Sequence, residues 1–137
     1  MITPASRILV VDDFELVHMQ MKVILNELGY LKVSDCKNGR QAWVAMTAAA
    51  ETSQPFDLLF CDWNMPDMNG IELLKTVRKD ERTKDTLFLM LTAESEQSYL
   101  TEALMAGADD YIVKPFSFEM IKNKIAFLNR KSERKKA

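Results

Sequence analysis

Five short apolar runs alternate with segments of helical periodicity along the chain, and this alternation constrains the fold more than any other feature. The apolar runs cover residues 7–12, 31–36, 58–61, 87–91 and 111–113, and the helical segments between and after them cover residues 17–28, 40–50, 70–79, 96–107 and 117–128. Strict alternation of this kind favours a parallel sheet with helices on both faces and right-handed crossovers. We therefore predict an α/β fold with three layers and a five-stranded parallel sheet.

Residues 58–61 form a short, continuous apolar run and are expected to be a strand buried on both faces. Asp62 follows directly, and turn residues then occupy 65–70. Pro66 fixes φ, and Asn69 and Gly70 tolerate positive φ. The run 31–36 is more polar and is placed at the sheet edge. The helical stripes predict these buried residues: Val17, Met21, Ile24, Leu25, Leu28, Ala42, Met46, Ala49, Leu73, Leu74, Val77, Leu100, Ala103, Leu104, Ile121, Ile125 and Leu128.

Length and composition fit one domain. The 137 residues carry a net charge of −2, which gives no electrostatic argument for binding nucleic acid. No apolar run is long enough to span a membrane, and MITPASR lacks an apolar signal region. Cys36 and Cys61 have no metal-ligand spacing and are expected to be reduced core residues of a cytoplasmic protein. We divide the chain into an extension (1–6), a domain (7–129) and a basic tail (130–137).

Polar side chains follow four of the predicted strands, and parallel strands bring these ends to one edge of the sheet. They are Asp12, Asp13, Asp62, Thr92 and Lys114. Crowded carboxylates repel one another and favour a divalent cation; oxygen ligands of this kind suit Mg²⁺. A lysine and a hydroxyl beside them fit the charge of a phosphoryl group, with one carboxylate as the nucleophile. Capping of the following helix is the structural alternative for Asp12 and Asp13.

Three other side chains are interpreted more simply. His18 is the single histidine of the chain and has no partner at metal-ligand spacing, so we expect a solvated helix residue. Trp63 adjoins Asp62 and is expected to report on metal binding through its fluorescence. Ser117 is expected to cap the last helix.

Four motifs carry a resemblance that covers residues 7–128. VVDDF, CDWNMPDMNG, LTAE and YIVKPF resemble the receiver domain of two-component response regulators, and the single-domain chemotaxis regulators are especially similar. The resemblance implies a flavodoxin-like (βα)5 fold with strand order 2-1-3-4-5. It also implies a cis peptide bond between Lys114 and Pro115.

The resemblance assigns a role to each site residue. Asp62 would accept the phosphoryl group as 4-aspartylphosphate, and Lys114 would pair with the phosphoryl oxygens. Mg²⁺ would be held by Asp12, Asp13, Asp62 and the backbone carbonyl of Asn64. Thr92 and Tyr111 would form the switch, and Asn64 and Glu94 would tune the lifetime of the phosphoryl group.

The implied partners are a sensor histidine kinase or phosphotransfer protein and a downstream effector. The effector would bind the face formed by the fourth helix, the fifth strand and the fifth helix. The chain departs from the chemotaxis relatives at residues 94–98, which are acidic and polar where those relatives carry basic residues. This departure leaves the identity of the effector open, the flagellar motor included.

We therefore predict a stand-alone, monomeric response regulator of chemotaxis type with no output domain, and not an enzyme. A rival class is a Mg²⁺-dependent phosphohydrolase with an aspartyl-phosphate intermediate. Haloacid-dehalogenase-like phosphatases place an acidic residue two positions after the nucleophile, where this chain has Asn64, which cannot transfer a proton. A phosphorelay shuttle, a phosphate sink and a degenerate receiver that only binds a partner also stay open.

Overall fold

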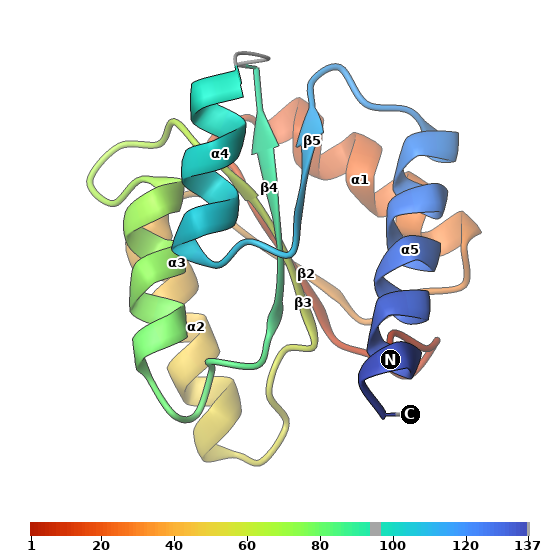
Figure 1. Cartoon of the computed structure of the whole chain (residues 1–137), viewed down its shortest axis with the longest axis horizontal. Helices are drawn as coiled ribbons and strands as arrows, with labels where there is room; N and C mark the ends of the chain where they lie inside the picture. The colour runs from red at the N-terminus through yellow and green to blue at the C-terminus, as the bar shows by residue number, and fades with distance from the viewer. Residues whose placement is uncertain (94–96, 137) are drawn as a thin grey trace.

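Five parallel strands in the order β2-β1-β3-β4-β5 form the central sheet of the computed structural model (Figure 1). The structure describes residues 1–93 and 97–136, with the backbone alone for 133–136. The predicted α/β class, parallel sheet and strand order are confirmed. The elements are β1 (Ile8–Val11), α1 (Glu15–Glu27), β2 (Val33–Cys36), α2 (Gly39–Glu51), β3 (Leu58–Asp62), α3 (Gly70–Lys79), β4 (Leu87–Thr92), α4 (Gln97–Ala106), β5 (Asp110–Val113) and α5 (Phe118–Lys136).

The helices cover the sheet in two layers. Helices α2, α3 and α4 lie on one face, and α1 and α5 lie on the other (Figure 1). Strand β3 is buried along its whole length and serves both cores: Leu59 and Cys61 pack under α2 and α3, whereas Leu58 and Phe60 pack under α1 and α5. This two-sided burial explains why the run 58–61 is continuously apolar rather than alternating.

The loop between β3 and α3 is built differently from the prediction. Asp67, and neither Asn69 nor Gly70, takes the left-handed conformation, with φ of 66°. Asn69 caps α3 in a reciprocal capping box with Glu72. Gly70 is needed for close packing, because an added Cβ would lie 2.4 Å from the carbonyl oxygen of Asp62.

Most predicted inward residues of the helices are buried, but Leu104 of α4 is not. Its stripe position predicted burial, yet 46% of its surface is exposed, while Leu100 and Ala103 of the same helix are buried. Helix α4 therefore contacts the sheet over a narrower strip than its sequence indicates. Ser117 caps α5 as predicted, by accepting a hydrogen bond from the Met120 amide at 3.2 Å.

The first residues of the chain pack onto α5. Ile2 is buried, and its backbone N–H donates to Oδ1 of Asn129 at 2.6 Å. Its carbonyl oxygen accepts a hydrogen bond from Nδ2 of Asn129 at 3.1 Å. The proposed boundaries at residues 7 and 129 remain predictions. These contacts nevertheless show that residue 2 contributes to the core under α5.

The two cysteines are free thiols on the same face of the sheet. Cys36 of β2 and Cys61 of β3 both lie opposite Val11 of β1 in the strand register. They are thus two strand spacings apart, about 9–10 Å. That separation exceeds the Cα distance that a disulfide spans.

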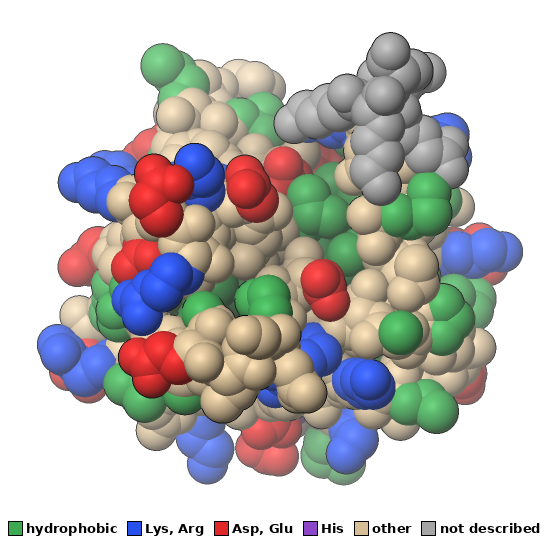
Figure 2. Space-filling view, turned by 90° about the horizontal axis from the view of Figure 1, so that it is seen from below, with side chains coloured by type: hydrophobic (Ala, Val, Ile, Leu, Met, Phe, Trp, Pro, Cys, Tyr) green, Lys and Arg blue, Asp and Glu red, His purple; other side chains and the backbone are tan. Residues whose placement is uncertain are grey.

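The edge of the sheet at the amino ends of the strands shows interspersed acidic and basic side chains (Figure 2). Neither sign of charge forms a block on the described part of this face, in keeping with the net charge of −2. Among the described residues, no helix has the length and apolarity that a membrane crossing requires.

Arg78 of α3 joins three parts of the fold. Its guanidinium donates to the carbonyls of Gly107, Lys84 and Thr86 and to the carboxylate of Asp109, at 2.6–2.9 Å. Asp109 also accepts the amide of Phe88 in β4 at 2.8 Å. Because both side chains are about four-fifths buried, their loss would leave several polar groups unpaired.

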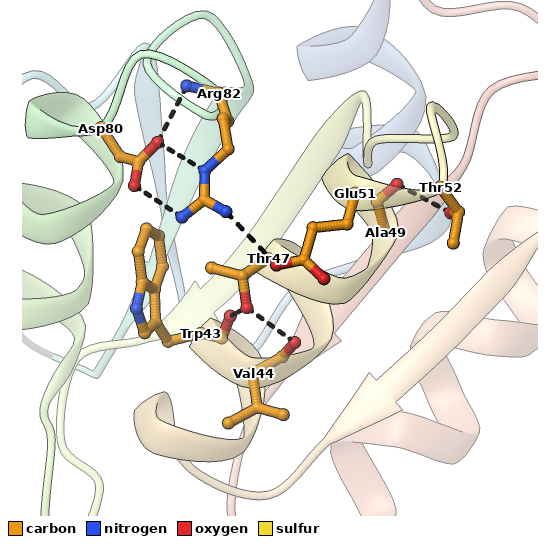
Figure 3. Close-up of polar contacts among 8 residues, drawn as sticks. All are labelled: Trp43, Val44, Thr47, Ala49, Glu51, Thr52, Asp80 and Arg82. Atoms are coloured by element: carbon orange, nitrogen blue, oxygen red, sulfur yellow. Dashed lines mark hydrogen bonds and ion pairs between the residues drawn. The ribbon is translucent and has the colours of Figure 1, made fainter.

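A second arginine makes comparable contacts on the surface. Arg82 pairs with Asp80, at the end of α3, and with Glu51, at the end of α2 (Figure 3). The Arg82 side chain is 46% exposed. Solvent screens such pairs, so they contribute little to stability.

Replacing Arg78 should therefore destabilise the protein far more than replacing Arg82. We expect Arg78→Met to lower the free energy of unfolding by roughly 3 kcal/mol, because the Asp109 carboxylate and three carbonyls lose their donor. Arg82→Met is the matched control and should have a small effect. Urea denaturation, followed by circular dichroism, measures the free energy of unfolding of both variants. Equal decreases in the two variants would contradict the importance of the buried contacts of Arg78.

Candidate functional site

The carboxyl ends of the strands bring distant residues of the chain together. Asp12 follows β1, Asp62 ends β3, Thr92 ends β4 and Lys114 follows β5. These ends lie along the upper edge of the sheet in Figure 1. In open α/β sheets, this edge is where ligands bind.

Three carboxylates form an acidic cluster at this edge. One oxygen from each of Asp12, Asp13 and Asp62 lies within 4.8 Å of the others. Asp12 is fully buried and Asp62 is 8% exposed, whereas Asp13 faces solvent. The cluster is thus closed at its base and open at Asp13. An all-oxygen set of this kind fits Mg²⁺, which binds a few carboxylates and keeps several waters.

The ammonium group of Lys114 lies between two of the carboxylates. Its Nζ is 2.7 Å from Oδ2 of Asp12 and 3.2 Å from Oδ1 of Asp62. The backbone fixes the position of this lysine, because its amide donates to the Thr92 carbonyl at 2.8 Å. The Lys114–Pro115 peptide bond is cis, as the resemblance implied.

These contacts raise the pKa values of both Asp62 and Lys114, through different balances of burial and charge. Burial raises the pKa of Asp62, the charge of Asp12 raises it further, and Lys114 counteracts both. For Lys114, burial lowers the pKa, but the hydrogen bond to Asp12 and the charge of Asp62 outweigh it and raise the pKa overall. Lys114 therefore stays protonated and positively charged. The ionised form of Asp62 remains unfavourable beside it, and a bound metal cation would favour that form.

Asp12 is fixed through all of its polar groups. Its amide donates to the Cys36 carbonyl at 3.1 Å, and its Oδ1 accepts the Phe14 amide at 2.9 Å. Its carbonyl lies 2.6 Å from Nε2 of His18. Together with Lys114, these partners come from four different segments, so Asp12 has little freedom to move.

The prediction of a solvated His18 is wrong. His18 is only 5% exposed and lies against the β1–α1 loop. The sequence contained a signal for this: residues 18, 21 and 25 share one helical face, and Met21 and Leu25 are fully buried. The absence of a second metal-type ligand at the right spacing is no argument for exposure.

The other predicted site residues differ in burial and in the element that carries them. Thr92 is buried, Asn64 is exposed in the loop after β3, and Tyr111 is half-buried on β5. The Lys124 ammonium of α5 lies 5.2 Å from the centre of the Tyr111 ring. Glu94 lies outside the described residues. The roles given to these residues remain predictions.

Trp63 makes a contact that the sequence did not indicate. It is 7% exposed, and its ring meets Tyr99 of α4 edge-on, with ring centres 5.4 Å apart. The residue after Asp62 therefore touches the helix beyond β4. Such edge-to-face pairs add about 0.5–1.5 kcal/mol to the packing.

Comparisons with known proteins agree with this geometry. The family model described as the response regulator receiver domain matches residues 8–126. The chain is 40% identical to the chemotaxis protein CheY1 of Helicobacter pylori, and 41% identical to the chemotaxis protein CheY of Pseudomonas aeruginosa. Each match covers 87% of this chain, with 93% and 92% of the relative. The solved structure of CheY4 of Vibrio cholerae matches with a TM-score of 0.79 and 32% identity, over 88% of this chain and 96% of that one.

The raised pKa of Asp62 predicts a pH-dependent stability in the metal-free protein. A folded-state pKa above the ordinary value of 3.8 means that ionisation at neutral pH opposes folding, and that the penalty disappears at pH values below 3.8. We therefore expect Asp62→Asn to raise the free energy of unfolding at pH 7 in EDTA. The gain should shrink as the pH falls through the folded-state pKa.

Urea denaturation at several pH values measures this effect. Asp85→Asn is the matched control, because Asp85 is exposed. A stabilisation by Asp62→Asn that is the same at pH 3 and pH 7 would contradict the electrostatic account.

Proposed function

Because the chain belongs to the response regulator receiver family and is related to the CheY chemotaxis proteins, we propose that Asp62 accepts a phosphoryl group from a phosphohistidine. The donor is a sensor histidine kinase or a phosphotransfer protein. The observation that carries this proposal is the Lys114 ammonium, 3.2 Å from Asp62 and 2.7 Å from Asp12 within an acidic cluster. This arrangement suits a negatively charged group that becomes attached to Asp62.

The proposed step is an in-line displacement. A carboxylate oxygen of Asp62 forms a bond to phosphorus, the phosphorus–nitrogen bond of the donor histidine breaks, and the product is an acyl phosphate. Lys114 neutralises charge on the phosphoryl oxygens. Asp12, Asp13, Asp62 and the Asn64 carbonyl would hold Mg²⁺, which supplies further charge neutralisation. Asn64 and Glu94 would set how long the product survives.

The phosphodonor has a suitable docking surface beside the site. Leu16, Met19 and Val23 of α1 are 56–60% exposed and, with Phe116 and Phe118, line an apolar groove. Phe116 follows Lys114 by two residues, so a donor protein seated in this groove would lie beside the site. We assign this groove to the donor.

The effector surface lies on another side of the molecule. After phosphorylation, Thr92 would bind the phosphoryl group and Tyr111 would move inward, which changes the face of α4, β5 and α5. The exposed apolar side chains of α4 and α5 include Leu104, Met105 and Phe127. A chemotaxis-type effector is the favoured partner, and the cytoplasm is the compartment in which kinase and effector would meet.

Phosphohydrolase activity is disfavoured by the loop after β3. The residue two positions after Asp62 is Asn64, an amide that has no proton to transfer to a leaving group. A phosphorelay shuttle or phosphate sink uses the same chemistry at Asp62, and differs in whether a second histidine protein receives the group.

Incubation with Mg²⁺ and acetyl phosphate should add one phosphoryl group to the protein. Intact-mass spectrometry measures the product, and Asp62→Asn should abolish it. Asp67→Asn is a matched control, since Asp67 lies in the same loop and is exposed. An unchanged yield in Asp62→Asn would contradict the proposal, and rapid multiple turnover of p-nitrophenyl phosphate would favour the phosphohydrolase.

The switch predicts a second result. With Mg²⁺ and beryllofluoride, which imitates the acyl phosphate, amide signals of Tyr111 and of α4 should shift in nuclear magnetic resonance spectra. Thr92→Val should suppress these shifts while leaving the acetyl phosphate reaction in place, because it removes the hydroxyl and keeps the side-chain shape. Thr76→Val on α3 is the control. Shifts of full size in Thr92→Val would contradict the role of Thr92.

A further inference from the structure

We propose that His18 is a positioning residue that fixes Asp12, and through it the β1–α1 loop, for metal binding. His18 is buried on α1, and its Nε2 lies 2.6 Å from the Asp12 carbonyl oxygen. A carbonyl oxygen only accepts, so the hydrogen-bond network assigns the proton to Nε2. The inference rests on the proposed function in that Asp12 and Asp13 are the expected Mg²⁺ ligands.

Asp12 lies where the sheet no longer holds the chain on the β3 side. The β1–β3 pairing ends at Val11, opposite Cys61. On the β2 side the Asp12 amide still bonds to the Cys36 carbonyl. The Asp12 carbonyl takes its donor from α1, the imidazole of His18.

The burial of an imidazole at this position is otherwise unfavourable. Nδ1 of His18 is buried and has no hydrogen-bond partner among the described residues. Leaving a buried polar atom unpaired opposes folding. An apolar side chain would join Met21 and Leu25 without that penalty, so what histidine adds is the Nε2–H donor.

Loss of the hydrogen bond from His18 to the Asp12 carbonyl would affect the metal site directly. The same residue carries the carboxylate that contacts Lys114 and the Phe14 amide, and Asp13 follows at once. Mg²⁺ requires near-ideal octahedral geometry, so small displacements of its carboxylate ligands weaken binding. Loss of groups that orient metal ligands typically weakens metal affinity 10- to 100-fold.

The test compares His18→Leu, which removes the donor, with His18→Gln, which keeps an N–H at a similar reach. Met21→Ala is the control, because it removes buried volume from the same helix without touching Asp12. Two properties are measured: the hydrogen-exchange rate of the Phe14 amide in the metal-free protein, and the Kd for Mg²⁺ from Trp63 fluorescence.

We expect His18→Leu to weaken Mg²⁺ binding roughly 10-fold and to speed exchange at Phe14. His18→Gln should restore most of the Mg²⁺ affinity and most of the slow exchange at Phe14, and Met21→Ala should keep the wild-type Kd. A wild-type Kd and exchange rate in His18→Leu would overturn the inference, as would an equal loss in Met21→Ala or a failure of His18→Gln to restore binding.

The two proposals fail separately. A wild-type protein that binds no Mg²⁺ would remove the metal from the proposed function, and the exchange rate at Phe14 would still decide whether His18 holds Asp12. If the wild type binds Mg²⁺ and His18→Leu binds it with the same Kd, the inference about His18 is overturned and the proposed function stands. If His18→Leu fails to fold, His18→Met, which also removes the donor and fills the same buried space with an unbranched apolar side chain, takes its place in both measurements.

Discussion

The Lys114 ammonium group lies between Asp12 and Asp62, and the rest of the site depends on this shared contact. Two carboxylates less than 5 Å apart repel one another by roughly 3–4 kcal/mol at an effective dielectric near 20. The three residues come from the ends of β1, β3 and β5, and the parallel sheet brings these ends to one edge. The lysine offsets part of the repulsion, and the exposed side at Asp13 leaves room for a cation to offset more.

The sequence predicted those parts of the structure that depend on local pattern. Strand β3 and the inward stripe of α2 follow from apolar periodicity, and the convergence at the carboxyl edge follows from the alternation of strands and helices. The order of the strands came from the resemblance alone. Composition and spacing do not contain it, because they say nothing about which parallel strands are neighbours.

The errors concern residues whose environment is set by distant segments. His18 is buried because the β1–α1 loop folds back over it, and Leu104 is exposed because α4 meets the sheet along a narrow strip. Asp67 adopts positive φ, while Asn69 caps α3 and Gly70 approaches the Asp62 carbonyl. Helical position and turn propensity are weak guides where such competing contacts decide.

The packing of Ile2 against α5 has a practical consequence for handling the protein. Residue 1 and the last turn of α5 lie near the amino ends of the strands, at the opposite edge of the sheet from the acidic cluster (Figure 1). Attachment to a surface through either end would leave the acidic edge facing solution. An affinity tag fused ahead of Met1 would directly precede Ile2, which is buried and anchored by Asn129, whereas a carboxyl-terminal tag avoids this contact.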